Sequence, residues 1–383
     1  MTNTESSPDI VVIGGGVTGA FTTYSLAALG ARATLIERDG IAAHASGKNP
    51  GGLNPLHGAG IPGPMTPLAV ESFRLHMENA AAIEELSGIA CAPRRVTRTH
   101  LAFDEADVAV LDRLRQPYRS APGFSAEWVE REDILAHDSG VNPALLRGLR
   151  TEGNAKVHPA AYTRAVVDAA IALGASAASG EVRGLRHSGR RVTEVLTDSG
   201  SLRCGAVVIA TGPWSIDPSR WLDTSIPLEP VRGELLQVEA ASPSVKGDFA
   251  WRDAAVYGAA DGHAWLGGSE DRCGFDATPS AAARRSILER ASRMFPGLDR
   301  APVSAHTAAL RPATPDGFPI VGLADGWENA CLALGGGRKG MLLAAGMGRA
   351  AAEMLTAGTT TLPVGPCSPT RWTDSRQPSQ VGT

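Results

Sequence analysis

The regular pattern of apolar positions begins near the start of the chain. Residues 10–13 form the apolar run IVVI, which predicts a strand buried on both faces. The spacing Gly-x-Gly-x-x-Gly follows at 14–19, and residues 20–29 then repeat apolar side chains at helical spacing until Gly30. A second apolar run at 33–36 predicts another buried strand. The pattern therefore predicts a strand, a tight turn, a helix and a second strand, which is how an α/β domain begins.

Further along the chain, helical and strand-like patterns alternate. Residues 66–88 and 105–116 show helical spacing, and residues 158–174 place a proline in a predicted first turn and end on glycine. Residues 93–104 alternate as a strand does, and residues 177–210 predict short strands separated by turns. No internal repeat and no linker rich in proline or serine divides the middle of the chain, which favours two interleaved domains.

The three glycines of the first turn each have a physical reason. Gly14 allows the tight turn, Gly16 lets a pyrophosphate approach the backbone, and Gly19 lets the helix pack against the strand. The first helical residues, Val17 and Thr18, present free N–H groups at the positive end of the helix. This motif, placed between a strand and a helix, predicts a site for a dinucleotide.

An acidic residue ends the second predicted strand. Glu37, followed by Arg38, lies about 20 residues after the glycine motif, where a carboxylate accepts hydrogen bonds from the ribose hydroxyls of a dinucleotide. A carboxylate at this place disfavours the extra phosphate of NADP. The unit by itself leaves FAD and NAD as alternatives.

A segment with few side chains follows this unit. Residues 44–64, HASGKNPGGLNPLHGAGIPGP, contain six glycines and four prolines. Glycine removes the side chains that hold a backbone away from a ligand, so the segment can lie along an extended dinucleotide and offer it N–H groups. A surface loop is the alternative, because glycine and proline mark loops in general.

Composition and charge narrow the class of protein. The 383 residues are enough for two domains, and with 43% apolar residues the chain is globular. The net charge of −4 without a basic patch gives no support to nucleic-acid binding. The five cysteines are scattered without metal-ligand spacing, so no metal site is predicted. The start of the chain lacks the pattern of a signal peptide and no apolar run is long enough to span a membrane, so a cytoplasmic protein is expected.

Four segments resemble those of a known family, the FAD-dependent amine and amino-acid oxidoreductases that include D-amino-acid oxidase, glycine oxidase and monomeric sarcosine oxidase. HASGKNPGG at 44–52 is similar to the segment that these proteins run along their flavin. VVIATGPWS at 207–215 is similar to their strand and turn back into the cofactor site. LRPATPDGFPIVG at 310–322 resembles their arginine-bearing strand pair, and residues 335–355 resemble their C-terminal glycine turn and helix. The segments occur in the family's order.

The resemblance implies FAD as the cofactor and extends the set of predicted contacts. Besides the residues of the first unit named above, the implied FAD contacts are Ser46, Gly47, Lys48, Asn49, Gly51, Gly52, Leu53, Val182, Thr211, Gly212, Trp214, Gly336, Gly337, Arg338, Lys339, Gly340 and Met341.

The fold class predicted is α/β, with an overall α+β architecture. A Rossmann-type FAD-binding domain would be interleaved with a substrate domain built on a mostly antiparallel sheet. The FAD-binding domain is expected to comprise residues 1–80, 146–215 and 305–358, and the substrate domain residues 81–145 and 216–304. A loosely ordered tail is expected at 359–383, where proline, serine and threonine are frequent.

The resemblance also implies a carboxylate clamp. In the family reaction a hydride moves from the α-carbon of an amino acid to the flavin, so the protein has to supply position and charge. Arg311 stands at the family's substrate arginine in LRP, and a guanidinium meets a carboxylate with two parallel hydrogen bonds. A surface or interdomain salt bridge is the alternative role for Arg311.

Four further residues are candidates for the reaction. Arg338 and Lys339 directly precede the helix that begins near Met341, where cations and the helix N-terminus would stabilise negative charge on the flavin. Arg338 could instead reach the substrate carboxylate. Tyr257 corresponds to a tyrosine-bearing strand in the family's substrate pocket, and His57 could accept the proton that the substrate ammonium loses. Structural roles for these residues, such as packing or a solvated surface, stay open.

His44 leaves the mode of flavin attachment open. HASG is similar to the H-x-x-G of dimethylglycine dehydrogenase-like relatives, whose histidine is joined covalently to the flavin. A tryptophan precedes the histidine in those proteins, and here the neighbour is Ala43. Non-covalent FAD is expected, with a link at His44 as the alternative.

The predicted function is FAD-dependent oxidation of a small amino acid, or of an N-methyl or secondary amino acid, to an imine that hydrolyses to an oxo acid. An FAD-dependent dehydrogenase of a 2-hydroxy acid or of glycerol phosphate is one alternative, and a flavin-bound subunit of a complex is another. The substrate and its handedness, the electron acceptor (oxygen or another) and the oligomeric state are not encoded in any motif of the chain.

Overall fold

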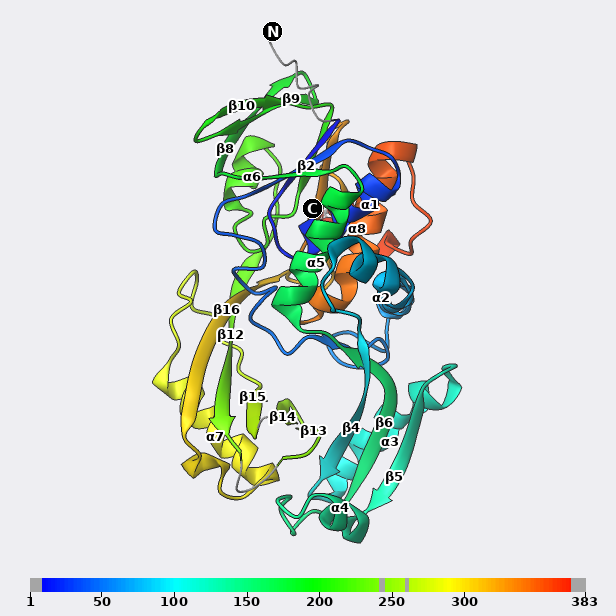
Figure 1. The fold of residues 1–383 in the computed structure, drawn as a ribbon, viewed down its shortest axis with the longest axis vertical. Coiled ribbons are helices and arrows are strands. Elements are labelled where there is room, and N and C mark those ends of the chain that lie inside the picture. The colour runs from blue at the N-terminus through cyan, green and yellow to red at the C-terminus, as the bar shows by residue number, and fades with distance from the viewer. Residues whose placement is uncertain (1–8, 241–244, 259–261, 373–383) are drawn as a thin grey trace, which may run out of the picture.

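Two large sheets form the framework of the molecule (Figure 1). The structure is a computed structural model of the chain and describes residues 9–240, 245–258 and 262–372. In the view of Figure 1 a six-stranded sheet lies in the upper half and a nine-stranded sheet in the lower half. The chain crosses between the two halves several times, so each sheet is assembled from segments far apart in the sequence.

The six-stranded sheet has the order β17-β18-β11-β1-β2-β7. All neighbouring strands are parallel except β17 and β18, which are antiparallel. All four residues of β1 are buried, as the apolar run predicted. The strands are β1 (Ile10–Ile13), β2 (Ala33–Glu37), β7 (Ser176–Ser179), β11 (Ala206–Ile209), β17 (Ile320–Leu323) and β18 (Ala330–Leu334).

Both faces of this sheet are covered. On one face, alternate strand side chains such as Val12 and Leu35 pack with four helices, α1 (Val17–Ala28), α2 (Thr66–Ser87), α5 (Pro159–Ala172) and α8 (Gly340–Ala357). On the other face, Val11 and Ile36 pack with a three-stranded sheet and with a short helix. These elements are β8 (Val182–Ser188), β9 (Arg191–Thr197), β10 (Gly200–Arg203) and α6 (Ile216–Trp221).

The nine-stranded sheet is antiparallel except where β13 pairs with β4. Helix α7 (Ala281–Met294) packs on one face through Ile287 and Ala291. The strands are β3 (Gly52–Leu53), β4 (Arg94–Ala102), β5 (Ser125–Glu130), β6 (Arg147–Lys156), β12 (Glu229–Glu239), β13 (Asp248–Trp251), β14 (Ala254–Gly258), β15 (His263–Gly267) and β16 (Val303–Ala313), and the remaining helices here are α3 (Glu105–Ser120), α4 (Arg131–His137) and the short η1 (Leu298–Arg300). The α/β fold class with a mostly antiparallel second sheet is confirmed.

The helices begin and end where their sequences indicate. Pro67 occupies the first turn of α2, and Gly88 ends that helix with a φ of +68°. The Asp104 side chain accepts a hydrogen bond of 2.8 Å from Asp107 N–H and caps α3. Helix α3 continues four residues beyond the expected end at 116, because the buried side chain of Tyr118 holds the last turn in place.

Four expected domain boundaries need correction. Helix α2 continues to Ser87 and, like α6, packs with the six-stranded sheet, although 81–145 and 216–304 were expected in the substrate domain. The segment 146–215 was assigned to the FAD-binding domain, but β6 at its start pairs with β4 and β5 in the nine-stranded sheet. The segment 305–358 was assigned in the same way, but most of β16 pairs along its length with β12. Neither strand has a clear period of two along its length, so the sequence did not reveal the strand's partner.

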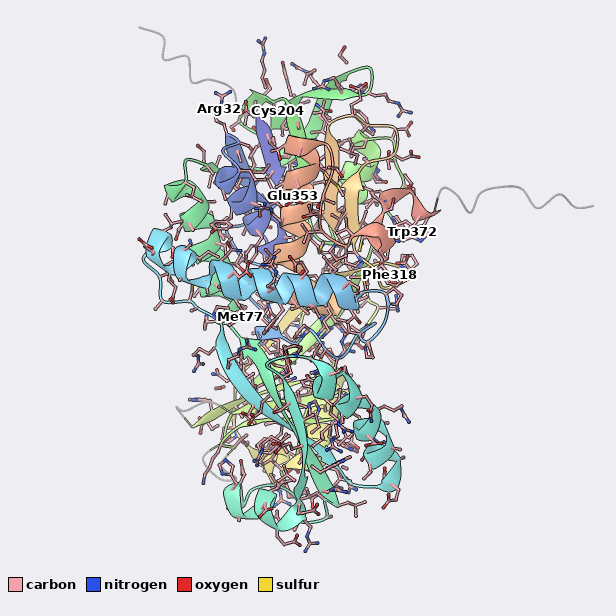
Figure 2. All side chains as sticks on the ribbon, turned by 90° about the vertical axis from the view of Figure 1, so that its right-hand side faces the viewer. Arg32, Met77, Cys204, Phe318, Glu353 and Trp372 are labelled. Atoms are coloured by element: carbon pink, nitrogen blue, oxygen red, sulfur yellow. The ribbon has the colours of Figure 1, made fainter. Side chains whose placement is uncertain are left out.

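The expected loose tail is wrong for residues 359–372. Leu362, Val364 and Cys367 are buried, and the short helices η3 (Gly365–Cys367) and η4 (Pro369–Trp372) follow. The Arg371 guanidinium donates hydrogen bonds to the Asp316 carboxylate and to the Phe318 carbonyl oxygen. Figure 2 shows Phe318 and Trp372 on the same side of the molecule. Packing against β17 therefore orders this segment, and residues 373–383 lie outside the described residues.

Within the three described ranges, no helix combines the length and the apolar character that crossing a membrane requires.

Candidate functional site

A cavity of about 790 Å³ lies between the two large sheets. One wall, here called the glycine-rich wall, is formed mainly at the carboxyl ends of β1, β2, β11 and β18 and comprises lining residues within 13–54, 180–182, 210–221 and 333–341. The opposite wall, here called the arginine-bearing wall, comprises lining residues within 233–235, 253–257, 267–290 and 309–312. Ligands of open parallel sheets bind at the carboxyl ends of the strands, so the cavity is where the sequence predicted a cofactor.

The first glycine turn, between β1 and α1, is part of the glycine-rich wall. Gly14 has a φ of +111°, and a Cβ there would lie 2.5 Å from the Ala210 carbonyl oxygen. A Cβ at Gly19 would lie 1.9 Å from the Gly14 carbonyl oxygen, so the helix contacts the turn directly. Gly16 begins α1 without a side-chain cap, and the Val17 N–H donates a hydrogen bond of 2.8 Å to Ser46 Oγ. The predicted reasons for Gly14 and Gly19 are thus confirmed.

Glu37 is held at the cavity wall by the backbone around it. Its two carboxylate oxygens accept hydrogen bonds from the N–H groups of Gly15, at 2.6 Å, and Asp39, at 2.7 Å. Arg38 forms an ion pair of 3.0 Å with Asp39 and lines the same part of the cavity. A carboxylate fixed beside the N-terminus of α1 is the arrangement that a dinucleotide ribose requires.

The segment after Glu37 bends back along the cavity and is held by its own side chains. The Asn49 amide donates hydrogen bonds to the carbonyl oxygens of Ala45 and Ser46, at 2.9 and 3.0 Å, and its oxygen accepts one of 2.7 Å from Gly51 N–H. Lys48 and Asn49 line the cavity. Residues 44–54 are therefore an ordered part of the wall, whereas residues 58–64 form a mostly exposed turn, as the alternative of a surface loop expected.

Five predicted FAD contacts do not line the cavity. Four of them, Gly19, Gly47, Gly51 and Leu53, lie behind this wall, and the fifth is Lys339. A Cβ at Gly47 would lie 2.2 Å from the Ala42 carbonyl oxygen, and one at Gly51 would lie 1.9 Å from that of Val157. Leu53 is fully buried in the core. These four residues therefore serve close backbone packing, which the family motif did not distinguish from contact with a ligand.

The remaining predicted contacts of this wall do line the cavity, and they are Gly14, Gly16, Val17, Thr18, Ser46, Gly52, Val182, Thr211, Gly212, Trp214, Gly336, Gly337, Gly340 and Met341. Most offer backbone groups or small side chains along an extended path. The Val17 N–H, expected to be free, is taken by Ser46 Oγ, so a diphosphate would meet the positive end of α1 rather than this donor. The positive end of α1, the fixed Glu37 carboxylate and this path suit the diphosphate, the ribose and the length of FAD. The residues present therefore fit the cofactor that the resemblance implied.

His44 lies at this wall in contact with acidic and aromatic side chains. Its Nε2 is 2.7 Å from an Asp39 carboxylate oxygen, and its ring centroid is 4.4 Å from that of Trp214. The hydrogen bond from His44 and the charge of Arg38 hold the pKa of Asp39 below its usual value. The ring nitrogen Nε2 is thus already occupied by a protein partner.

Arg311 is the guanidinium of the arginine-bearing wall that has no acidic partner. Its Nη1 donates a hydrogen bond of 3.2 Å to the Ser269 carbonyl oxygen, and no carboxylate of the described residues is within ion-pair distance. Across the ladder its guanidinium covers Gly233, where a Cβ would lie 2.1 Å from Arg311 Cζ. Burial, and then the nearby charge of Arg338, lowers the pKa of Arg311. An unpaired, partly desolvated guanidinium is a strong site for an anion.

Arg338 and Tyr257 reach the same end of the cavity from different elements. Arg338 belongs to the short helix η2 (Gly337–Lys339) and forms an ion pair of 3.3 Å with Glu270, which follows β15. Tyr257 lies on β14 and lines the cavity, and its ring has Arg98 Cζ at 5.1 Å and Lys156 Nζ at 4.8 Å. The structure thus brings three of the four predicted catalytic residues to one cavity.

The fourth, His57, does not line the cavity. Its Nδ1 is 2.6 Å from the Tyr118 hydroxyl, and its ring lies edge-on to that of His100. Burial and the charge of Lys339 hold the pKa of His57 well below its usual value. Its position away from the cavity wall does not support the expected role as the acceptor of the substrate proton.

Lys339 also lies behind the wall. Its ammonium group donates hydrogen bonds to the carbonyl oxygens of Asn54, at 3.0 Å, and His57. Burial, with the charges of Arg98 and Arg338, lowers the pKa of Lys339 to about 7. The expected role at the flavin is replaced by a tether between η2 and the segment after β3.

Several lining residues were not predicted. Gly233 and Ala255 lie on the cavity face of the nine-stranded sheet. Ser269 and Glu270 follow β15, and Arg290 lies on α7. None belongs to a recognisable motif, so the sequence offered no signal for them. Strand alternation would have placed Gly233 on one face of β12, but it could not say which face meets the cofactor.

Among the described residues, no group of three or more histidine, cysteine, aspartate and glutamate side chains could hold a metal ion.

The comparisons with known proteins agree with this geometry. Residues 9–354 match the family described as FAD dependent oxidoreductase, DAO. The chain is 28% identical to a glycine oxidase of Pseudomonas aeruginosa, over 91% of this chain and 95% of that protein, and 27% identical to a glycine oxidase of Pseudomonas putida, over 95% and 98%. It also resembles the crystal structure of glycine oxidase from Geobacillus kaustophilus, with a TM-score of 0.87 and 25% identity over 96% and 99% of the two chains. The protein is therefore a member of the FAD dependent oxidoreductase family.

Proposed function

We propose that this FAD-dependent enzyme oxidises a small amino acid, or an N-methyl or secondary amino acid, at the carbon that bears the amine. The product would be an imine that hydrolyses to an oxo acid. The observation that carries the proposal is Arg311, a guanidinium that lines the cavity without an acidic partner. The similarity to glycine oxidases along nearly the whole chain supports an amino acid as the substrate class.

Arg311 would bind and orient the substrate carboxylate. Its guanidinium is fixed between the Ser269 carbonyl oxygen and the backbone of Gly233, so little side-chain entropy remains to be lost when a carboxylate binds. Two parallel hydrogen bonds from one guanidinium set the direction of the carboxylate as well as its position. The α-carbon of the substrate would thereby be directed toward the glycine-rich wall.

The chain also supplies positive potential where the two walls meet. Helix α8 begins at Gly340 with free N–H groups, and Arg338 lies two residues before it. The chemistry that FAD supplies when bound is acceptance of a hydride from the substrate carbon. The helix N-terminus and Arg338 favour negative charge in this part of the cavity throughout the reaction.

The FAD would be held without a covalent link. The His44 Nε2 is engaged with Asp39, and the wall offers backbone groups along the whole path of the cofactor. Yellow colour in the supernatant after acid precipitation supports this mode, and yellow colour in the pellet contradicts it.

The function is tested with the purified holoenzyme under anaerobic conditions. We expect a panel of D-, L- and N-methyl amino acids to include one class that bleaches the visible flavin band, with release of ammonia or amine. Rapid recovery of the band in air would identify an oxidase, and slow recovery a dehydrogenase. Bleaching by 2-hydroxy acids or glycerol phosphate alone contradicts the proposal, and a flavin that no compound bleaches favours a subunit of a complex.

The Arg311→Ala variant tests the clamp. We expect kcat/KM for the amino acid to fall by about 30-fold to 1,000-fold, mainly through KM, because a desolvated carboxylate loses a charged partner. The corresponding amine without a carboxylate should lose little. Flavin content checks that the cofactor site is intact. Equal losses for the two compounds contradict the assignment.

A further inference from the structure

Three charged side chains surround one end of the cavity. Arg311 and Glu270 belong to the arginine-bearing wall, and Arg338 belongs to the glycine-rich wall. A Glu270 carboxylate oxygen lies 3.3 Å from Arg338 Nη1. Burial lowers the pKa of Arg311 most, Arg338 lowers it further, and Glu270 raises it. The carboxylate of Glu270 is therefore close enough to the clamp to act on any ligand that Arg311 holds.

The backbone that carries Glu270 is fixed on both sides. The preceding residue, Ser269, accepts a hydrogen bond of 2.8 Å from Glu234 N–H through its hydroxyl, and its carbonyl oxygen accepts the one from Arg311. The following residue, Asp271, exchanges two backbone hydrogen bonds of 2.8 and 2.9 Å with Arg232. Glu270 thus stays at the cavity wall next to the residue that the clamp contacts.

The charge of Glu270 is only partly compensated. Its side chain is 47% exposed and that of Arg338 is 51% exposed, and one hydrogen bond joins them. Such a half-exposed pair adds little to stability, but it engages Arg338, so this cation is not left without a partner for a second anion. A ligand with one carboxylate on Arg311 would bring a second carboxylate toward Glu270, where two like charges repel each other.

The wall beside the clamp carries small residues, but the protein fills part of the space above them. The Arg311 guanidinium covers Gly233 and the Leu235 side chain lies against Gly267, whereas Ala255 lines the cavity with a single methyl group and the cavity continues to Asp253. The charge of Glu270 would therefore act together with size against a substrate with a carboxylate-bearing side chain.

We propose that Glu270 is a specificity-determining residue that excludes a second carboxylate, so that the substrate is a monocarboxylic amino acid. This inference rests on the proposed oxidation of an amino acid and names the substrate class of the same cavity. Neutral substituents pass Glu270 without this penalty. In a dicarboxylic or N-carboxyalkyl amino acid, the first carboxylate binds Arg311. The second carboxylate then lies near the carboxylate of Glu270, which repels it.

Isosteric pairs of compounds test the proposal on the holoenzyme. Glutamine and glutamate, in the handedness that the enzyme accepts, have the same size and differ in one charge. We expect the wild type to prefer glutamine in kcat/KM by at least about tenfold, and Glu270→Gln to reduce that preference at least about tenfold, through KM for glutamate. Calorimetric Kd values for succinate and its monoamide, succinamate, should show the same change without any turnover.

Glu328→Gln is the matched control. Glu328 and Arg191 also form an ion pair of 3.3 Å with both side chains more than half exposed, and both lie outside the cavity. This variant should keep the preference of the wild type. Because Glu270 is partly exposed, the wild-type preference should also decrease as the salt concentration rises.

The outcomes separate this inference from the proposed function. A preference that is the same within twofold in the wild type and in Glu270→Gln overturns the role of Glu270 and leaves amino-acid oxidation intact. A wild type that accepts glutamate as readily as glutamine also overturns it. A holoenzyme that oxidises no amino acid and binds neither succinate nor succinamate overturns the proposed function, and the inference about Glu270 with it.

Discussion

The two walls of the cavity are built in different ways. The glycine-rich wall comes mainly from short motifs in which a strand end, a turn and a helix start are adjacent in the sequence, and it offers backbone groups. The arginine-bearing wall comes from β12, β14, β15, β16 and α7, and it offers charged side chains. A cofactor shared by a whole family can be bound by backbone geometry, whereas substrate choice depends on side chains that long-range pairing brings together.

The contrast is clearest at two glycines. Gly19 contacts the Gly14 carbonyl oxygen five residues earlier, so its role can be read from the local motif. Gly233 leaves space for Arg311, which is on a different strand. Both positions exclude a Cβ, but only the first belongs to a spacing that a sequence can reveal.

Substitution at Gly19 should have the largest effect on FAD binding and stability, because it disturbs the contact between the first turn and α1 in the glycine-rich wall. A Cβ in Gly19→Ala would lie 1.9 Å from the Gly14 carbonyl oxygen, so α1 has to move away from the turn. We expect the Kd for FAD to rise at least about 100-fold, which corresponds to about 3 kcal/mol, together with a lower melting temperature. The measurements are flavin content and thermal unfolding.

Gly365→Ala serves as the control for Gly19→Ala. The backbone of Gly365 has no positive φ, and no atom lies within 4 Å of a Cβ built there. Its flavin content should equal that of the wild type. Full flavin content and an unchanged melting temperature in Gly19→Ala would show that FAD binding does not depend on the backbone geometry of the glycine-rich wall.

Substitution at Gly233 should damage the arginine-bearing wall alone. The new Cβ of Gly233→Ala would meet the Arg311 guanidinium at 2.1 Å and displace it. We expect KM for the amino acid to rise about tenfold or more, while FAD content and kcat change little. Gly184→Ala on β8 is the control, since its Cβ would meet an ordinary contact of 3.6 Å with Leu196. Loss of FAD in Gly233→Ala would mean that the two walls are not independent.

The last prediction concerns Lys339, which tethers η2 to the segment after β3 behind the glycine-rich wall. The pKa of Lys339 is about 7 in the folded protein, against about 10.4 for an exposed lysine. Between these values the unfolded chain binds more protons than the folded one, so this group makes stability rise with pH. The stability of the wild type relative to Lys339→Met should therefore increase from pH 7 to pH 10, on the order of 1 to 3 kcal/mol.

Chemical denaturation of the holoenzyme at several pH values measures this difference. Lys246→Met replaces an exposed lysine, and its difference from the wild type should stay flat over the same range. A flat profile for Lys339→Met as well would show that the ammonium group is not desolvated, and would weaken its role as a tether.

Much of the fold followed from local signals. The strand at 10–13, the helices that begin at Thr66 and Pro159, and the glycine stops were all confirmed. The errors concerned both elements and their partners. No pattern predicted β6, and the strand pair that the resemblance implied at 310–322 did not reveal that β16 belongs to the second sheet, because the choice of sheet depends on which distant strand offers free backbone groups and a matching apolar face.

Residues 359–372 also show that a sequence pattern does not reveal which distant surface a segment packs against. Their composition of proline, serine and threonine is typical of loosely ordered chain, yet Leu362, Val364 and Cys367 are buried. Three apolar side chains among polar ones suffice when a preformed surface lies beside them. Composition alone does not report that surface, since it is built by β17 and its neighbours.

By itself, the sequence determined that this protein has a Rossmann-type unit, that Glu37 ends its second strand, and that a family arginine stands at position 311. The first two conclusions rest on contacts between residues close in the chain, where spacing specifies geometry, and the third rests on the resemblance of residues 310–322 to a family motif. Only the tertiary structure decided that His57 and Lys339 lie behind the wall and that Glu270 stands beside the clamp. The physical reason is that the direction of a side chain depends on strand register and on packing between elements that are not adjacent in the sequence.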